Sequence, residues 1–174
     1  MSNLLVTLVN ESGEHTGTSD RESAHRGEGK LHRAFSIFIF KTNEVLLQKR
    51  ASHKLFGNLW TNTCCSHPRP EEEIIDAAKR RLQEELDITC DLKECGSFIY
   101  KAHDEKGTEY EYDTVFVGQL ADDTTITPDM NEITEWKWMD IQQLQKDLAK
   151  NPHHYTPWLH QALLLAYSPT SLPA

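Results

Sequence analysis

The order of the apolar patterns along the chain constrains its fold more than any other feature of the sequence. Segments rich in strand-forming residues come first, one segment with helical spacing lies near the middle, further strand-like segments follow, and two helical segments end the chain. This order is typical of an α+β domain or of a mixed sheet with helices on its faces. We therefore predict an α/β (α+β) fold in which a mixed β-sheet is flanked by helices.

The predicted strands are bounded by turn-forming residues. They cover residues 4–9, 34–40, 44–49, 58–67, 97–102, 109–120 and 135–139. A polar triplet separates residues 34–40 from residues 44–49 and predicts a hairpin, and a second pair of strands is predicted around HDEKG. Residues 10–29 are polar and contain four of the eight glycines, so we predict a turn followed by a long loop there.

The central helix is predicted to begin near Pro70, because proline in a first turn followed by three glutamates suits the positive end of the helix dipole. Its buried stripe is predicted to consist of Ile75, Ala78, Leu82 and Leu86. The last two helices are predicted over residues 141–150 and 156–167, the second with Thr156 as its N-cap and Pro157 just inside.

The length and charge of the chain limit its possible partners. Its 174 residues suffice for one domain, expected over residues 1–174 with a flexible tail at 168–174. The net charge of −9 has the wrong sign for binding nucleic acid or an anionic membrane. We expect a cytoplasmic monomer whose small-molecule ligand, if anionic, is held by local cations or metals. The four cysteines are predicted to be free thiols.

Histidine and glutamate residues suggest a metal site. His25 and His32 flank the glycine-containing loop, His67 follows a Cys-Cys pair, and Glu109 and Glu111 share one face of a predicted strand. Imidazole and carboxylate groups together match a divalent ion such as Mn, Mg or Zn. A solvated strand face explains the two glutamates equally well. The other histidines are predicted to be surface residues: His15, His53, His103, His153, His154 and His160.

One cysteine and a group of charged residues on the central helix are further candidates for a functional site. Cys65 lies two residues before His67 among polar residues, where a thiol could move protons, whereas the other three cysteines are predicted to be small buried residues. On the central helix, Arg81 and Glu85 are four residues apart and could form a surface ion pair, or Glu85 and its neighbour Glu84 could face a metal.

The segment Thr61-Asn62-Thr63-Cys64-Cys65-Ser66-His67-Pro68, with Ala24-His25, Leu31-His32 and Glu109-Tyr110-Glu111, resembles the type I isopentenyl-diphosphate isomerases. The resemblance runs from about Leu4 to Trp158. Around the central helix the chain also resembles a degraded Nudix box, in which Glu72 precedes a run from Arg80 to Ile88. Ser66, Arg81 and Asp87 replace the Gly, Glu and Gly of that box, which counts against diphosphate hydrolysis.

The resemblance implies a Nudix-like fold and the interconversion of isopentenyl diphosphate with dimethylallyl diphosphate in isoprenoid biosynthesis. It implies Cys65 and Glu111 as the catalytic acid/base pair, and Glu85 as a ligand of Mg held with the substrate diphosphate. It also implies a first divalent ion bound by His25, His32, His67, Glu109 and Glu111.

Substrate contacts follow from the same resemblance. Diphosphate-binding positions match Arg21, Arg50, Lys54, Ser66 and Arg81. Trp158 matches an aromatic cap that could stabilise a tertiary cation through its ring face, although an ordinary core tryptophan is the alternative, and Tyr100 is expected near the catalytic glutamate. Proton addition on one face of the alkene and removal from the other requires two groups facing each other across the substrate.

Two other functions remain possible from the sequence. A Nudix pyrophosphohydrolase acting on a nucleoside diphosphate derivative would require a glutamate where Arg81 stands. A non-catalytic metal- or diphosphate-binding domain would not require Cys65.

Overall fold

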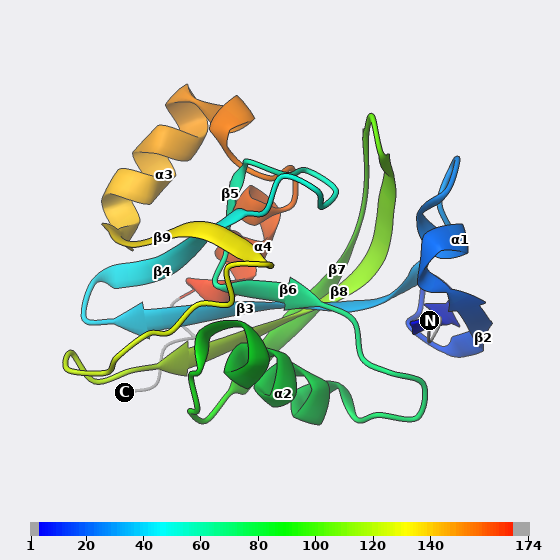
Figure 1. Cartoon of the computed structure of the whole chain (residues 1–174), viewed down its shortest axis with the longest axis horizontal. Helices are drawn as coiled ribbons and strands as arrows, with labels where there is room; N and C mark the ends of the chain where they lie inside the picture. The colour runs from blue at the N-terminus through cyan, green and yellow to red at the C-terminus, as the bar shows by residue number, and fades with distance from the viewer. Residues whose placement is uncertain (1–3, 169–174) are drawn as a thin grey trace.

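A nine-stranded sheet organises the computed structural model, which describes residues 4–168 (Figure 1). The strands are β1 (Leu5–Val9), β2 (His15–Asp20), β3 (His32–Lys41), β4 (Glu44–Arg50), β5 (Trp60–Thr61), β6 (Cys64–Ser66), β7 (Lys93–Asp104), β8 (Gly107–Gln119) and β9 (Ile133–Asp140). The helices are α1 (Arg21–His25), α2 (Ile74–Leu86), α3 (Ile141–Lys150), the 3-10 turn η1 (Pro152–His154) and α4 (Leu159–Ala166).

Strand β3 lies at the centre and separates two apolar clusters. Phe38 and Phe40 face the cluster under α3 and α4, whereas Ile37 and Ile39 face the cluster that α2 covers. Because successive side chains of a strand point to opposite faces, a strand buried on both faces needs a nearly continuous apolar run such as that of β3. Figure 1 shows α2 on one side of the sheet and α3 and α4 on the other, which confirms the predicted α/β class.

The partners of β3 bring distant segments together at one end of the sheet. β3 pairs in parallel with β8, so that His32 lies beside Glu111, and antiparallel with β6, so that Ser36 lies beside Cys65. β7 and β8 form the long hairpin predicted around HDEKG, and Tyr100 pairs with Glu111. The parallel pairing makes the sheet mixed.

The prediction of a turn and long loop over residues 10–29 is wrong in part, because the segment forms β2 and α1. β2 pairs antiparallel with β1, and Asp20 caps α1 by accepting a hydrogen bond from the Ser23 amide at 2.8 Å. An edge strand with mostly exposed polar residues has no apolar alternation to announce it, and a five-residue helix has no apolar stripe.

The central helix begins at Ile74 rather than near Pro70. Glu71 has φ of +64°, which is incompatible with a continuous helix, and Glu72 accepts a hydrogen bond from the Arg69 amide at 2.8 Å. The acidic run therefore precedes the helix instead of filling its first turn. The predicted stripe is buried at Ala78, Leu82 and Leu86, whereas Ile75 is half-buried.

The last helix also begins later than predicted, at Leu159. The Thr156 hydroxyl does not cap it, because it lies 2.8 Å from the hydroxyl of Thr61 in a buried hydrogen bond. Helix α3 has the predicted bounds, and Asp140 caps it through the Gln143 amide at 2.9 Å.

Cys64 is buried as predicted, but Cys90 and Cys95 are half-buried, and all four cysteines are free thiols. Within residues 4–168 no helix is long and apolar enough to cross a membrane. Of the tail predicted at 168–174, only Ser168 lies among the described residues, and the single domain over 1–174 stays a prediction.

Candidate active site and metal centre

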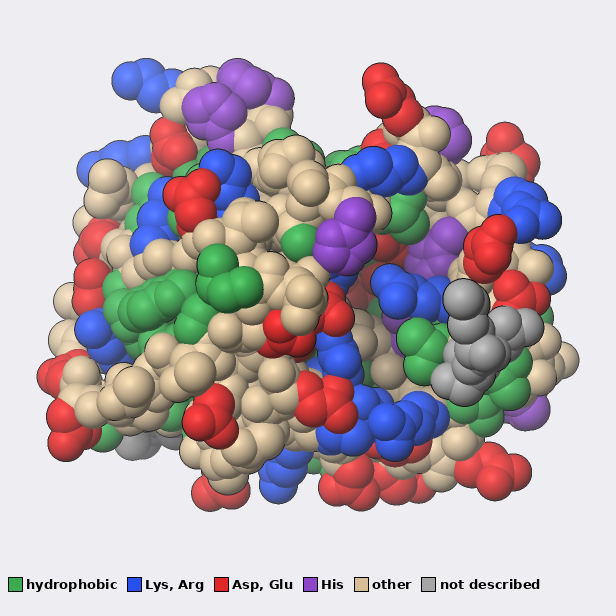
Figure 2. Space-filling model, in the orientation of Figure 1, with side chains coloured by type: hydrophobic (Ala, Val, Ile, Leu, Met, Phe, Trp, Pro, Cys, Tyr) green, Lys and Arg blue, Asp and Glu red, His purple; other side chains and the backbone are tan. Residues whose placement is uncertain are grey.

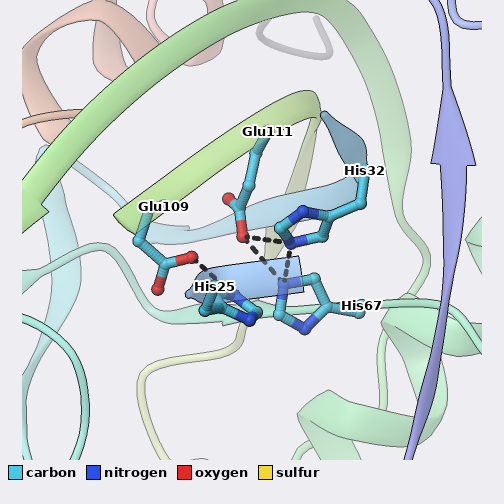
Figure 3. Close-up of side chains that lie close together, drawn as sticks. All are labelled: His25, His32, His67, Glu109 and Glu111. Atoms are coloured by element: carbon cyan, nitrogen blue, oxygen red, sulfur yellow. Dashed lines mark hydrogen bonds and ion pairs between the residues drawn. The ribbon is translucent and has the colours of Figure 1, made fainter. Parts of the chain in front are cut away.

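Five predicted ligands meet at one place in the fold. Their donor atoms all lie within 4.8 Å of one another. Figure 3 shows them pointing toward a common centre from α1, β3, the segment after β6, and β8: His25, His32, His67, Glu109 and Glu111. On the face drawn in Figure 2, histidine, acidic and basic side chains surround a hollow in its right half. The other six histidines are exposed, as predicted.

Backbone carbonyls set the tautomers of two of these imidazoles. The Nδ1 atom of His25 lies 2.6 Å from the Arg21 carbonyl, and the Nδ1 atom of His32 lies 2.7 Å from the Lys30 carbonyl. A carbonyl only accepts, so each Nδ1 carries hydrogen, and in a neutral ring the lone pair is left on Nε2. Such carbonyl partners are typical of histidines that ligate a metal through Nε2.

The Nε2 atoms of the three imidazoles lie close to a carboxylate oxygen or to one another. His25 Nε2 lies 3.0 Å from Glu109 Oε2, His67 Nε2 lies 2.8 Å from Glu111 Oε1, and the Nε2 atoms of His32 and His67 are 3.1 Å apart. Lone pairs that converge in this way repel unless a proton or a cation lies between them. The donor set therefore fits a divalent metal ion, and nitrogen with carboxylate oxygen suits Mn, Mg or Zn to different degrees.

Electrostatics favours the ligand forms of His67 and Glu111, whereas His25 is shifted toward its protonated form. Burial lowers the pKa of His67 to about 3 despite its hydrogen bond with Glu111, so its imidazole is neutral. Burial opposes ionisation of Glu111, but the imidazoles of His32 and His67 outweigh it and hold the pKa well below its usual value. At His25 burial is likewise outweighed, and hydrogen bonding to Glu109 raises the pKa.

The predicted thiol lies on the same side of the sheet as the cluster. Cys65 Sγ lies 3.0 Å from Asn62 Oδ1 and 3.9 Å from Ser36 Oγ, and Ser36 donates to Asp113 at 2.7 Å. Burial raises the pKa of Cys65 to about 11, against the opposing charge of Arg50, so the thiol keeps its proton.

Aromatic residues join the thiol region to the cluster. Tyr100 donates to Glu111 Oε2 at 2.5 Å and stacks on Trp158, with ring centroids 5.3 Å apart. The Arg50 guanidinium lies 5.2 Å from the Trp158 ring, and one of its nitrogens lies 3.9 Å from Glu109. Trp158 is 2% exposed, so the predicted cap is fully enclosed.

The remaining predicted residues lie outside the five-residue cluster. Glu85 is buried on α2, where Arg81 contacts it at 2.5 Å and Gln48 at 3.4 Å, so the pair is not a surface ion pair. Lys54 and Arg81 both bind Glu132, Arg81 at 3.2 Å.

The other three predicted residues differ in exposure. Arg21 is exposed, and its charge contributes to lowering the pKa of His67. Ser66 is half-buried on β6, and Glu84 is exposed on α2.

Two polar residues of the site were not singled out from the sequence. Asp113 is 1% exposed, and burial together with the charge of Glu111 raises its pKa well above the usual value. Asp113 lies two residues after Glu111 and so continues the spacing of two between Glu109 and Glu111. This spacing could have identified Asp113 as a site residue from the sequence. Asn62 is fully buried and has no such pattern.

Comparison with known proteins identifies the family of the chain. The NUDIX domain family model matches residues 30–159. An isopentenyl-diphosphate Delta-isomerase 2 from Aromatoleum aromaticum is 44% identical over 91% of this chain and 84% of its own length. An isopentenyl-diphosphate Delta-isomerase from Nocardia farcinica is 45% identical over 92% of this chain and 93% of its own length.

The chain belongs to the isopentenyl-diphosphate Delta-isomerase family of NUDIX-domain proteins. Solved structures agree on the NUDIX fold. DR0079 from Deinococcus radiodurans aligns with a TM-score of 0.74 at 20% identity, over 94% of this chain and 99% of that one. A NUDIX hydrolase from Nitrosomonas europaea aligns with a TM-score of 0.61 at 20% identity, over 83% and 97%. At these identities the likeness concerns the fold alone.

Helix α2 and the loop before it correspond to the NUDIX box. The structure shows what Glu72 and Arg80 do there, and what Arg81 and Asp87 do where the chain differs from the hydrolase pattern. Glu72 and Arg80 form two hydrogen bonds of 2.8 and 2.9 Å, which fix the loop before α2 against the helix. Asp87 ends α2 in the left-handed conformation with φ of +55°, where the box has glycine. Arg81 places a cation beside Glu85, where the box has a second carboxylate.

A surface cavity of about 590 Å³ lies on the other face of the sheet and shares no residue with the five-residue cluster. Tyr112 and Thr114 line it, and they alternate along β8 with Glu111 and Asp113.

Proposed function

We propose that this protein interconverts isopentenyl diphosphate and dimethylallyl diphosphate, in isoprenoid biosynthesis, as the names of its relatives indicate. The observation that carries the proposal is that a half-buried thiol, Cys65, lies on the same side of the sheet as the His/Glu cluster. A double-bond shift needs one proton added and another removed, and a thiol and a carboxylate can perform these two roles.

In this proposal Cys65 and Glu111 transfer the protons on opposite faces of the alkene. The thiol keeps its proton because its pKa is raised, whereas Glu111 is ionised because its pKa is lowered, so the pair contains one acid and one base at neutral pH. Tyr100 donates to Glu111 and orients its carboxylate. Two groups with pKa values moved in opposite directions are typical of acid/base sites.

The His/Glu cluster would hold a divalent ion, Mn, Mg or Zn, through His25, His32, His67, Glu109 and Glu111. Bound there, the ion would supply fixed positive charge that favours the ionised form of its carboxylate ligands. A second ion, Mg, would be held by Glu85 together with the substrate diphosphate.

A tertiary cation formed at the alkene must be kept from water. Trp158 stacks on Tyr100 and is almost fully buried, so its ring face can stabilise positive charge while excluding solvent.

The diphosphate would be bound by cations that compensate locally for the net negative charge. We assign this role to Arg21, Arg50, Lys54, Ser66 and Arg81. Lys54 and Arg81 already converge on Glu132, which shows that two cations lie within reach of one anionic group. That the protein acts in the cytoplasm as a monomer stays a prediction from the sequence.

Incubation of the purified protein with Mg and isopentenyl diphosphate tests the proposal. Dimethylallyl diphosphate without phosphate release is expected. Phosphate release would instead indicate a pyrophosphohydrolase, which the Arg81–Glu85 contact disfavours, and no turnover would indicate a binding domain. Excess chelator should abolish the activity and added metal should restore it; activity that persists with chelator would contradict the metal role.

A further inference from the structure

The Asn62 side chain is buried and forms hydrogen bonds with residues of β3, of β6 and of the segment at the start of α4. It is 0% exposed and all of its polar atoms are bonded. Its Nδ2 atom donates to the carbonyls of Ile37 at 3.1 Å and Cys64 at 2.9 Å. Its Oδ1 atom accepts from the Thr61 hydroxyl at 2.9 Å, from Cys65 Sγ at 3.0 Å and from Trp158 Nε1 at 3.3 Å.

These partners determine which end of the amide is which. Backbone carbonyls only accept hydrogen bonds, so the amide nitrogen must face Ile37 and Cys64. The indole nitrogen of Trp158 only donates, so the amide oxygen must face it. The same oxygen then requires the Cys65 thiol to donate its proton toward Asn62.

One amide oxygen therefore contacts two residues that the proposed function uses. From Asn62, contacts continue through Trp158 to Tyr100 by ring stacking at 5.3 Å, and from Tyr100 to Glu111 by a hydrogen bond of 2.5 Å. Together with the Cys65 contact, these residues form a continuous connection from the thiol to the carboxylate.

A second contact between the same two segments supports this connection. The Thr61 hydroxyl, which donates to Asn62, lies 2.8 Å from the Thr156 hydroxyl, and the Thr156 amide donates to the Trp60 carbonyl at 2.9 Å. The segment before β6 and the segment before α4 are thus held at a fixed separation, and rotation of the indole would break its bond to Asn62.

We propose that Asn62 is a positioning residue that holds the Cys65 thiol and the Trp158 indole in a fixed relation to each other. The inference rests on the proposed function, because it assigns Asn62 a part in that reaction through two other residues. Asn62 itself transfers no proton. An error of about 1 Å in the position of a reacting group can lower turnover about 100-fold.

Thr63 provides a matched control. It is also 0% exposed and next to Asn62, but its hydroxyl bonds the Ile39 amide at 2.9 Å and the Leu46 carbonyl at 2.7 Å, away from the thiol and the indole. Asn62→Ala and Thr63→Val each remove buried hydrogen bonds from one short segment. Both are expected to lower the melting temperature, and only Asn62→Ala is expected to change the site.

Steady-state kinetics and indole NMR separate a positioning role from a structural one. Asn62→Ala should lower kcat about 30- to 300-fold with KM changed less than about threefold, since the diphosphate-binding cations are untouched. Thr63→Val should leave kcat within about twofold. The Trp158 indole proton, assigned by its absence in Trp158→Phe, should move upfield in Asn62→Ala and stay in place in Thr63→Val.

A second measurement needs no folded variant of Asn62. In the wild-type protein the Trp158 indole proton should exchange slowly with deuterated water and have the downfield shift of a hydrogen-bonded group. Rapid exchange would overturn the inference, as would a normal kcat in folded Asn62→Ala or equal kcat losses in the two variants. Failure of the wild-type protein to isomerise its substrate would contradict the proposed function instead, while the indole measurements would still report on Asn62.

Discussion

At the scale of single residues, the two adjacent cysteines differ in the side of β6 to which they point. Cys64 is 0% exposed and packs in the cluster under α2, whereas Cys65 packs beside the cluster that contains Trp158. Successive side chains of a strand point to opposite faces, so one position along the chain separates a packing residue from a site residue. The thiol chemistry is the same in both.

We predict that Cys65→Ala lowers turnover by about 10²- to 10⁴-fold, the usual contribution of a general acid or base. Cys64→Ala should leave turnover nearly unchanged and lower only stability, because it removes a buried sulfur from an apolar cluster. Isomerase rates and thermal melts of both variants measure this. Near-normal turnover in Cys65→Ala would remove the thiol from the proposed proton pair.

Glu109 and Glu111 should respond differently to added metal. Both belong to the predicted ligand set, but only Glu111 contacts Tyr100 and is assigned a proton-transfer role. Glu109→Gln and Glu111→Gln should each lower Mn affinity by at least about 10- to 100-fold, measured by calorimetry. Saturating metal should restore most activity to Glu109→Gln and little to Glu111→Gln. Equal recovery in the two variants would contradict a separate role for Glu111.

At the scale of elements, the tip of the β7–β8 hairpin packs against α1 and the segment after β4. Asp104 accepts the Phe56 amide at 2.6 Å, and Lys106 donates to the carbonyls of Ser52 and Lys54. The hairpin therefore supports the segment that contains Lys54.

Gly107 makes this packing possible, because a Cβ atom there would lie 2.6 Å from the His25 carbonyl oxygen. Gly107→Ala should lower the free energy of unfolding by about 1–3 kcal/mol and weaken metal binding, since His25 must move. Gly17→Ala is a matched control: Gly17 has the same φ of +158°, but its Cβ would meet no atom within 4 Å. Urea unfolding and metal titration distinguish them, and equal metal affinity in the two variants would show that the clash is absorbed without moving His25.

At the scale of the whole molecule, a net charge of −9 coexists with paired cations near α2. Lys54 and Arg81 converge on Glu132. Burial opposes the ionisation of Glu132, but the two cations outweigh it and lower its pKa to about 2 from 4.5. The net charge thus describes the molecule as a whole, whereas the pKa of Glu132 is set by the two cations beside it.

This low pKa predicts a pH-dependent contribution of Glu132 to stability. A carboxyl group whose pKa is lowered by folding stabilises the native state fully above its unfolded pKa, near 4.5, and loses that effect as the pH falls toward about 2. Glu132→Gln should therefore lower the free energy of unfolding by about 1–3 kcal/mol at pH 7, and the difference from wild type should shrink steadily below pH 4.5.

Glu135→Gln is the control for this titration, because Glu135 pairs with Lys49 while its side chain is 57% exposed. Exposed ion pairs contribute about 0–1 kcal/mol. Chemical unfolding from pH 7 to pH 3 measures both variants. If the difference in free energy of unfolding between Glu132→Gln and wild type stayed constant from pH 7 to pH 3, it would contradict a lowered pKa of Glu132.

Local sequence patterns determined several elements of the fold and the residues of the predicted metal site. The apolar run of β3, the hairpin around HDEKG and the bounds of α3 follow from residue type and spacing, because these elements bury continuous or periodic apolar faces. The resemblance carried by residues 61–68, with residues 24–25, 31–32 and 109–111, named the five predicted ligands, and the structure gathers their side chains at one point. Elements without an apolar face, β2 and α1, were not predictable in this way.

The tertiary structure decided what those residues can do together. The parallel pairing of β3 with β8, 79 residues apart at His32 and Glu111 (111 − 32), sets the cluster, and no local pattern specifies it. Packing likewise brought Arg81 to Glu132 and Asn62 to both Cys65 and Trp158. Sequence spacing fixes which face of an element a side chain occupies, but which faces meet depends on how the whole chain buries its apolar surface.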